Sequence, residues 1–266
     1  MNKRELVNQI KTKKSLLCVG LDTDINKIPA HLGKDLSAIV TFNKAIIDAT
    51  KEHAVSYKVN TAFYEQYGAK GWELMEETLN YIPQECFTIA DAKRGDIGNT
   101  SAMYAKAFFE TMSFDSITVA PYMGEDSLSP FYSYPNKWII CLGLTSNKGS
   151  KDFQILNTGE EKLYQNVMKT VAKWGSSEDT MFVVGATKAE QMLEIRNSFP
   201  NHFLLVPGVG AQGGSLEDVC KNACNKDGGL IINSSRGIIY ASDKEDFALR
   251  AGEEAMKMQQ VMKQYL

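Results

Sequence analysis

The sequence lacks the features that mark a disulfide framework or a structural zinc site. It has only three histidines, which lie far apart and have no cysteine or carboxylate companions at ligand spacing. Its five cysteines are odd in number and form no CxxC pair, and most of them sit inside apolar runs. We therefore expect no bound metal and reduced, buried thiols, as in a cytoplasmic protein.

A strong charge imbalance and a long hydrophobic run are also missing. The formal net charge of −3 over 266 residues gives no global attraction to nucleic acid or to an anionic membrane, so a phosphate ligand needs a local site. The apolar run that follows the charged N-terminal segment is too short, and too soon interrupted by Asp22, for a secretory signal, and no stretch is long enough to span a membrane. The expected protein is soluble and cytoplasmic, and it binds neither nucleic acid nor membrane.

What the sequence does contain is a series of short apolar runs rich in β-branched residues. Such continuous runs are typical of parallel strands that are buried on both faces. The eight runs cover residues 16–22, 54–60, 87–93, 116–121, 138–145, 181–186, 203–208 and 229–235.

Amphipathic stretches separate these runs and indicate helices. Examples are residues 38–53, 67–82 and 105–112, and the last helix is expected near 244–264. The repeating order of strand and then helix predicts an α/β fold, and eight repeats favour a closed (β/α)₈ TIM barrel with an extra N-terminal helix. No linker, low-complexity tract or repeat marks a boundary, so residues 1–266 are expected to form one barrel domain.

Charged residues follow several of the predicted strands, where a TIM barrel builds its active site. Side chains at positions i and i+2 of a strand share a face, so Asp91 and Lys93 should project together, and Lys58 on the neighbouring strand could reach them. Burial of these charges requires that they neutralise one another. A purely structural ion pair at the barrel rim is the alternative. Arg94 has the opposite parity, which suggests a support residue or a surface ion-pair partner.

Two further aspartates near strand ends have alternative interpretations. Asp22 follows the first predicted strand and either binds a ligand or caps a turn or helix. Asp96 lies in the loop after the third strand, where it could instead be the N-cap of a helix that begins near Asn99.

A phosphate site is predicted at the other side of the barrel mouth. Barrel enzymes often bind phosphate through the loops after strands seven and eight. The glycine-rich segment 206–214, with Gly208 and Gly210, follows the seventh predicted strand, and Arg236 follows the eighth. A glycine-rich turn and a solvated arginine are the alternatives when each is taken alone, but together they favour a bidentate phosphate contact.

Several motifs together resemble the orotidine 5′-phosphate decarboxylase family, in its longer microbial type. The resemblance runs from about Leu16 to Ile238. Its most specific part is DAKRGDIGNT, and it is supported by GLDTD, SYKVNTAFYEQYG, LTSNKGSKDFQ, PGVGAQGG and NSSRGI.

The resemblance implies a role for each matching position. The implied catalytic network is Lys58, Asp91, Lys93 and Asp96. Asp96 would be supplied by the partner subunit of a homodimer with shared active sites, together with Ile97 and Thr100. The implied ribose contact is Asp22, the pyrimidine contact is Ser146, and the phosphate contacts are Gln212 and Arg236, with residues 208–214 as a closing lid.

The implied reaction converts orotidine 5′-phosphate, a small nucleotide, to UMP without a metal or organic cofactor. Loss of CO₂ from C6 leaves an electron pair in the plane of the ring, and the pyrimidine carbonyls cannot delocalise it well. A fixed cation beside C6 is needed, and Lys93 could stabilise this charge and then deliver the proton.

Two other functions remain open on the sequence. A metal-dependent phosphosugar decarboxylase or aldolase of the same barrel superfamily shares the D-x-K-x-x-D spacing, but these relatives carry glutamate near the Lys58 position. A non-catalytic barrel that binds a phosphate ligand would keep Arg236 and the glycine-rich loop but would not need Lys93 and both aspartates.

Overall fold

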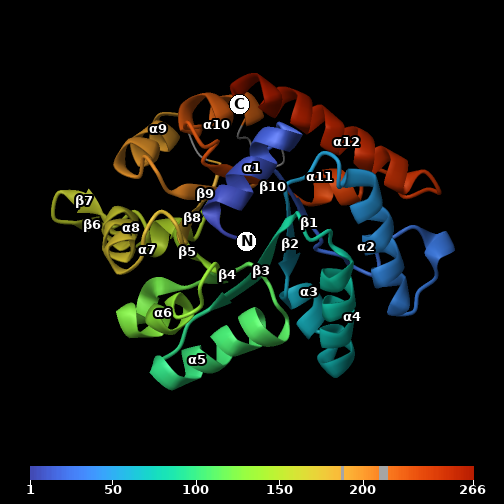
Figure 1. The fold of residues 1–266 in the computed structure, drawn as a ribbon, viewed down its shortest axis with the longest axis horizontal. Helices are drawn as coiled ribbons and strands as arrows, with labels where there is room; N and C mark the ends of the chain where they lie inside the picture. The colour runs from blue at the N-terminus through green and yellow to red at the C-terminus, as the bar shows by residue number, and fades with distance from the viewer. Residues whose placement is uncertain (187–188, 210–214) are drawn as a thin grey trace.

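The computed structural model describes residues 1–186, 189–209 and 215–266. Its centre is a closed barrel of parallel strands in the order β1-β10-β9-β8-β5-β4-β3-β2 (Figure 1). The strands are β1 (Leu17–Gly20), β2 (Ser56–Asn60), β3 (Phe87–Arg94), β4 (Ser116–Val119), β5 (Trp138–Leu144), β8 (Thr180–Val184), β9 (Phe203–Pro207) and β10 (Leu230–Ser234). The predicted TIM barrel is confirmed, and each predicted strand overlaps one of these eight.

Helices surround the barrel in the expected alternation (Figure 1). The α-helices are α1 (Lys3–Lys13), α2 (Ser37–Thr50), α3 (Ala62–Glu65), α4 (Gly68–Tyr81), α5 (Gly98–Lys106), α6 (Glu125–Tyr132), α7 (Ser150–Phe153), α8 (Leu163–Trp174), α9 (Ala189–Ser198), α10 (Leu216–Ala223), α11 (Arg236–Ile239) and α12 (Phe247–Met262). Short 3₁₀ turns are η1 (Ala30–Leu32), η3 (Pro121–Met123) and η4 (Lys263–Tyr265), and η2 (Ala107–Thr111) is a π-helical turn. Within the described ranges, no helix is long and apolar enough to cross a membrane.

An aromatic layer fills the barrel at the starts of the strands. Trp138 packs edge-on against Phe87 and Phe203, with ring centroids 6.0 and 6.1 Å apart, and all three side chains are fully buried. They come from alternate strands of the barrel, as the layers of a TIM-barrel core do. The Trp138 indole Nε1 donates to the carbonyl of Met1, which ties the chain before α1 to this end. The opposite end, where the strands finish, is left for polar residues.

Two local features depart from the predicted pattern. A two-stranded hairpin, β6 (Asn157–Thr158) with β7 (Glu161–Lys162), and the short α7 stand between β5 and α8. The stretch predicted as a helix at 105–112 contains the end of α5 and the π-helical turn η2, and α5 begins at Gly98, close to the helix start near Asn99 that the alternative interpretation of Asp96 expects. Small residues such as Ser101 and Ala105 form its buried face, so a search for large apolar residues misses the first turns.

Arg196 on α9 holds four chain segments together from inside the protein. Only 6% of this residue is exposed, and its guanidinium donates at 2.7–2.8 Å to the backbone carbonyls of Phe199, His202, Ala223 and Gly229. Loss of the guanidinium would leave several buried carbonyls unpaired, each at a cost of about 1–3 kcal/mol.

We therefore expect Arg196→Met to lower the free energy of unfolding by roughly 3 kcal/mol or more, as measured by urea denaturation. Arg250→Met is the matched control and should change stability little, because Arg250 forms exposed ion pairs with Asp246 and Glu253 at the surface of α12. Equal stabilities of the two variants would contradict this role of Arg196.

Candidate active site

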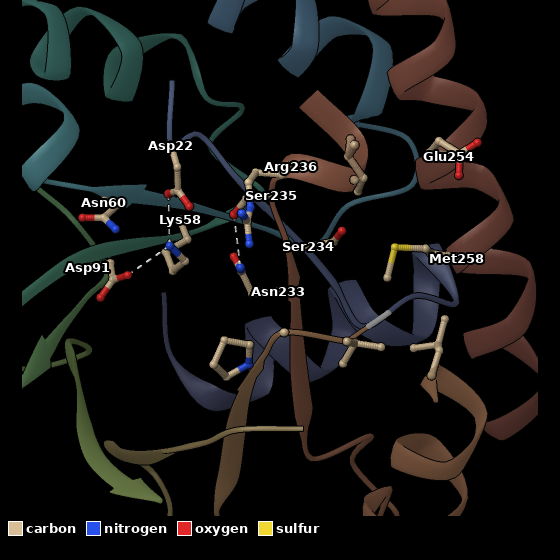
Figure 2. Close-up of a pocket in the computed structure, with 16 residues that line it drawn as sticks. Asp22, Lys58, Asn60, Asp91, Asn233, Ser234, Ser235, Arg236, Glu254 and Met258 are labelled. Atoms are coloured by element: carbon tan, nitrogen blue, oxygen red, sulfur yellow. Dashed lines mark hydrogen bonds and ion pairs between the residues drawn. The ribbon is translucent and has the colours of Figure 1, made fainter. Parts of the chain in front are cut away.

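A cavity of about 610 Å³ opens at the end of the barrel where the strands finish. Its wall is built by the ends of β2, β3, β9 and β10 and by α11 and α12 (Figure 2). Five of the residues predicted from the sequence line it, which brings the two predicted halves of the site into one cavity. They are Asp22, Lys58, Asp91, Gly208 and Arg236.

A chain of alternating charges runs along one wall. The Lys58 ammonium lies 3.3 Å from Asp22 Oδ1 and 3.0 Å from Asp91 Oδ2, and Figure 2 shows it between the two carboxylates. Asp91 Oδ1 lies 2.6 Å from Lys93 Nζ. Two carboxylates and two ammonium groups thus neutralise one another in the order Asp22–Lys58–Asp91–Lys93. The predicted contact of Lys58 and Lys93 with Asp91 is confirmed.

The neighbouring charges determine the pKa values of Asp91 and Lys58. Burial would raise the pKa of Asp91, but the positive charges of Lys58 and Lys93 outweigh it and lower the pKa to about 2. Burial would likewise lower the pKa of Lys58, but the carboxylates of Asp91 and Asp22 outweigh it and raise the pKa. Both groups are therefore charged at neutral pH.

The two lysines differ in how far their side chains are exposed. Lys58 is 4% exposed and has a carboxylate on each side, so it serves as an internal support. Half of the Lys93 side chain is exposed, and Asp91 is its one ion-pair partner among the residues that the structure describes. Lys93 does not itself line the cavity, but it is the exposed ammonium of this charge network and lies 2.6 Å from Asp91, which does line it.

The Asp22 segment is held from behind by buried polar groups that the sequence analysis did not single out. Tyr64 OH donates to the Leu21 carbonyl at 3.1 Å, and Thr23 Oγ1 donates to the buried Asn43 amide oxygen at 2.6 Å. Tyr240 OH donates to the carbonyl of Asp22 itself at 3.3 Å. These contacts fix the backbone on both sides of Asp22, whose carboxylate is then free to face Lys58.

The other side of the cavity presents polar groups from the end of β10. Ser234, Ser235 and Arg236 line it in sequence, and the Arg236 guanidinium forms no ion pair within the described part of the chain. Gly20 is needed for this arrangement, since a Cβ atom there would lie 1.9 Å from Ser235 Oγ. The arginine is thus available for an anionic ligand.

Five other predicted residues that the structure describes are not part of this cavity wall: Lys93, Asp96, Ile97, Thr100 and Ser146. Asp96 accepts from the Ile97 amide at 2.7 Å, and Ile97 is 56% exposed just before α5, which contains Thr100. Ser146 follows β5 and packs so close to Gly185 that a Cβ atom there would lie 2.8 Å from it. Gly210 and Gln212 lie outside the described residues.

The alternative interpretation of Asp96 as a helix cap is wrong. α5 begins at Gly98, its N-cap position is Ile97, and no side chain caps it. Arg94 is an ion-pair partner, which is one of its two predicted roles. It pairs with Glu65 and lies over the ring of Tyr104, away from the cavity.

Several lining residues were missed by sequence reasoning. Asn60, Ser234 and Ser235 are visible in the sequence as polar strand ends, but nothing there assigns them to a cavity. Glu254 and Met258 come from α12, and only the folded chain brings that helix to the mouth (Figure 2). In the described ranges, no three histidine, cysteine, aspartate or glutamate side chains are grouped so that they could hold a metal ion.

The closed barrel and the alternating charges at its mouth define a TIM barrel of the enzyme type. Comparison with known proteins identifies the family. The profile of the orotidine 5′-phosphate decarboxylase / HUMPS family matches residues 15–251, and the chain belongs to that family.

Similar proteins cover nearly the whole chain. An orotidine 5′-phosphate decarboxylase of Phocaeicola vulgatus is 57% identical over 270 residues, which cover 100% of this chain and 99% of the relative. One of Flavobacterium johnsoniae is 58% identical over 265 residues, covering 98% and 97% of the two chains. The solved structure of Leishmania donovani OMP decarboxylase has a TM-score of 0.83 and 38% identity, and the match covers 97% of this chain and 99% of that one.

Proposed function

We propose that this chain decarboxylates orotidine 5′-phosphate to UMP and that Lys93 delivers the proton to C6. The observation that carries the proposal is the Asp22–Lys58–Asp91–Lys93 chain, which ends in one accessible ammonium group beside the cavity. Family membership and the full-length similarity to orotidine 5′-phosphate decarboxylases support the choice of substrate.

The geometry supplies what this reaction needs. When CO₂ leaves C6, a negative charge develops in the ring plane, and a cation already fixed at that point stabilises it without reorganisation. Asp91 holds the Lys93 ammonium at 2.6 Å, and Lys58 holds the other oxygen of Asp91 at 3.0 Å. The same ammonium then transfers a proton to C6 as the general acid.

The rest of the nucleotide would occupy the cavity between α11 and the charged residues Asp22, Lys58 and Asp91. Arg236 would bind the phosphate, together with Gln212 and the backbone of residues 208–214. Asp22 would bind the ribose, and Ser146 would contact the pyrimidine. Binding energy from the remote phosphate would then orient the ring for the reaction.

We further propose a cytoplasmic homodimer with shared active sites, in which residues 1–266 form one barrel domain. Asp96, Ile97 and Thr100 would reach the partner's cavity. In support, Asp96 forms no ion pair with any described residue, and large apolar side chains are exposed around α5. Ile97 is 56%, Met103 62% and Tyr122 93% exposed, and a partner subunit would cover such a surface.

A turnover assay with and without EDTA tests the proposed function against its alternatives. Because Lys58 and Lys93 already neutralise both carboxylates, we expect orotidine 5′-phosphate to be consumed at the same rate in EDTA. Metal-dependent turnover of a sugar phosphate would instead identify a phosphosugar enzyme. Nucleotide binding without turnover would identify a binding protein.

Arg236→Ala is expected to weaken UMP binding by about 10- to 100-fold, because it removes a charged hydrogen-bond donor from the phosphate. Isothermal titration calorimetry would measure the change, and guanidinium ion in solution should restore part of the affinity. Arg250→Ala on the exposed face of α12 is the control and should bind UMP as the wild type does. Unchanged affinity in Arg236→Ala would place the phosphate elsewhere.

A further inference from the structure

Strand β3 contains a bulge at the residues that carry the reactive charges. Its pairing with β4 runs through Ala90 opposite Ile117 and resumes with Arg94 opposite Val119. Three residues of β3, numbers 91–93, therefore face a single residue of β4, Thr118. Such bulges re-aim side chains next to active sites, and here the bulge contains both Asp91 and Lys93.

Lys93 adopts a backbone conformation that residues other than glycine rarely take. Its φ angle is +48°, in the left-handed region, and the surrounding structure has to hold it there. Where the register of the ladder shifts, the Lys93 N–H donates to Thr118 Oγ1 at 2.9 Å. A side-chain hydroxyl thus holds the backbone of Lys93 within the bulge.

The same hydroxyl also binds the reactive carboxylate. Thr118 Oγ1 donates its one proton to Asp91 Oδ1 at 3.0 Å, and Thr118 is only 1% exposed. A hydroxyl can accept and donate at once, so the direction of both bonds is fixed. Asp91 Oδ1 accepts hydrogen bonds from Thr118 Oγ1 and Lys93 Nζ, while Asp91 Oδ2 accepts one from Lys58 Nζ.

We propose that Thr118 is a positioning residue for the reaction, whose hydroxyl fixes both the bulged backbone of Lys93 and the plane of the Asp91 carboxylate. The proposal rests on the proposed function, because it assigns the positioned ammonium to catalysis. A misplacement of about 1 Å at a reacting group can cost on the order of 100-fold in rate. The hydroxyl, and not the shape of the side chain, is the essential part.

Three variants separate these contributions. Thr118→Val keeps the shape and removes the hydroxyl, whereas Thr118→Ser keeps the hydroxyl. Thr180→Val is the matched control. Thr180 is also buried in a barrel strand, and its hydroxyl donates to the aspartate Asp179 at 3.0 Å. Unlike Thr118, it lies at the start of β8, away from the mouth of the barrel.

The measurements are kcat and KM with orotidine 5′-phosphate and the hydrogen-exchange rate of the Lys93 amide. For Thr118→Val we expect kcat to fall by about 10- to 100-fold, KM to stay within about threefold, and the amide to exchange at least about tenfold faster. Thr118→Ser and Thr180→Val should keep kcat within about threefold of the wild type.

Wild-type kcat in Thr118→Val, an equal loss in Thr118→Ser, or an equal loss in Thr180→Val would each overturn the proposal. A wild-type protein that does not turn over the nucleotide would instead overturn the proposed function, and with it the assignment of Lys93 to this reaction. Amide exchange would then still decide whether Thr118 holds the bulge, so the two failures are distinguishable.

Discussion

Replacing Lys93 with alanine is expected to reduce the turnover of orotidine 5′-phosphate by about 10³-fold or more, while UMP still binds. The substitution removes both the cation that stabilises the developing charge and the proton donor, and such general-acid groups alone contribute about 10²- to 10⁴-fold. The Arg236 side of the cavity stays intact, and Lys58 still neutralises Asp91 at 3.0 Å.

Single-turnover kinetics and calorimetric titration with UMP would measure the two effects separately. Lys51→Ala is a matched control, because Lys51 also pairs with an aspartate, Asp48, at 2.8 Å, but on the outside of the barrel. Retention of more than about a tenth of the wild-type rate by correctly folded Lys93→Ala would refute the assignment of Lys93 as the general acid.

Mixing two inactive variants is expected to restore activity if Asp96 serves the partner's site. In a two-fold dimer of Lys93→Ala and Asp96→Ala subunits, one site collects both defects and the other is fully wild type. Random exchange makes about half of the dimers mixed, so roughly a quarter of all sites should recover full activity.

Subunits exchanged through mild denaturant and assayed for decarboxylation give this fraction directly. Each variant carried alone through the same exchange is the control and should stay inactive. If Asp96 serves its own subunit, every active site carries one of the two substitutions and no activity returns. An absence of recovery despite demonstrated mixed dimers would therefore remove the shared-site proposal and leave the chemistry of Lys93 untouched.

The fold could be read from the sequence because its strands are buried on both faces. Their continuous apolar runs stand out against the amphipathic helices, and polar residues such as Asp22 and Lys58 mark the strand ends at the mouth. The amphipathic pattern marks only the end of α5, because small side chains such as Ser101 face its neighbours.

The candidate site was predictable only in part, for a different physical reason. Residue spacing correctly paired Asp91 with Lys93, but the pairing depends on a bulge and a left-handed Lys93, which alternation along a strand does not predict. Thr118 looks like an ordinary β-branched strand residue until the bulge places its hydroxyl between them. Met258 reaches the cavity only through the packing of α12, which depends on the whole fold.

The central claim is that protein side chains alone remove CO₂ from the nucleotide and protonate C6. The most direct test incubates the wild-type protein in D₂O and EDTA with orotidine 5′-phosphate that carries ¹³C in its carboxylate, and follows the products by NMR. We predict one labelled CO₂ for each UMP formed, with deuterium at C6 of the UMP. No release of labelled CO₂, or release only after a divalent metal is added, would contradict the account.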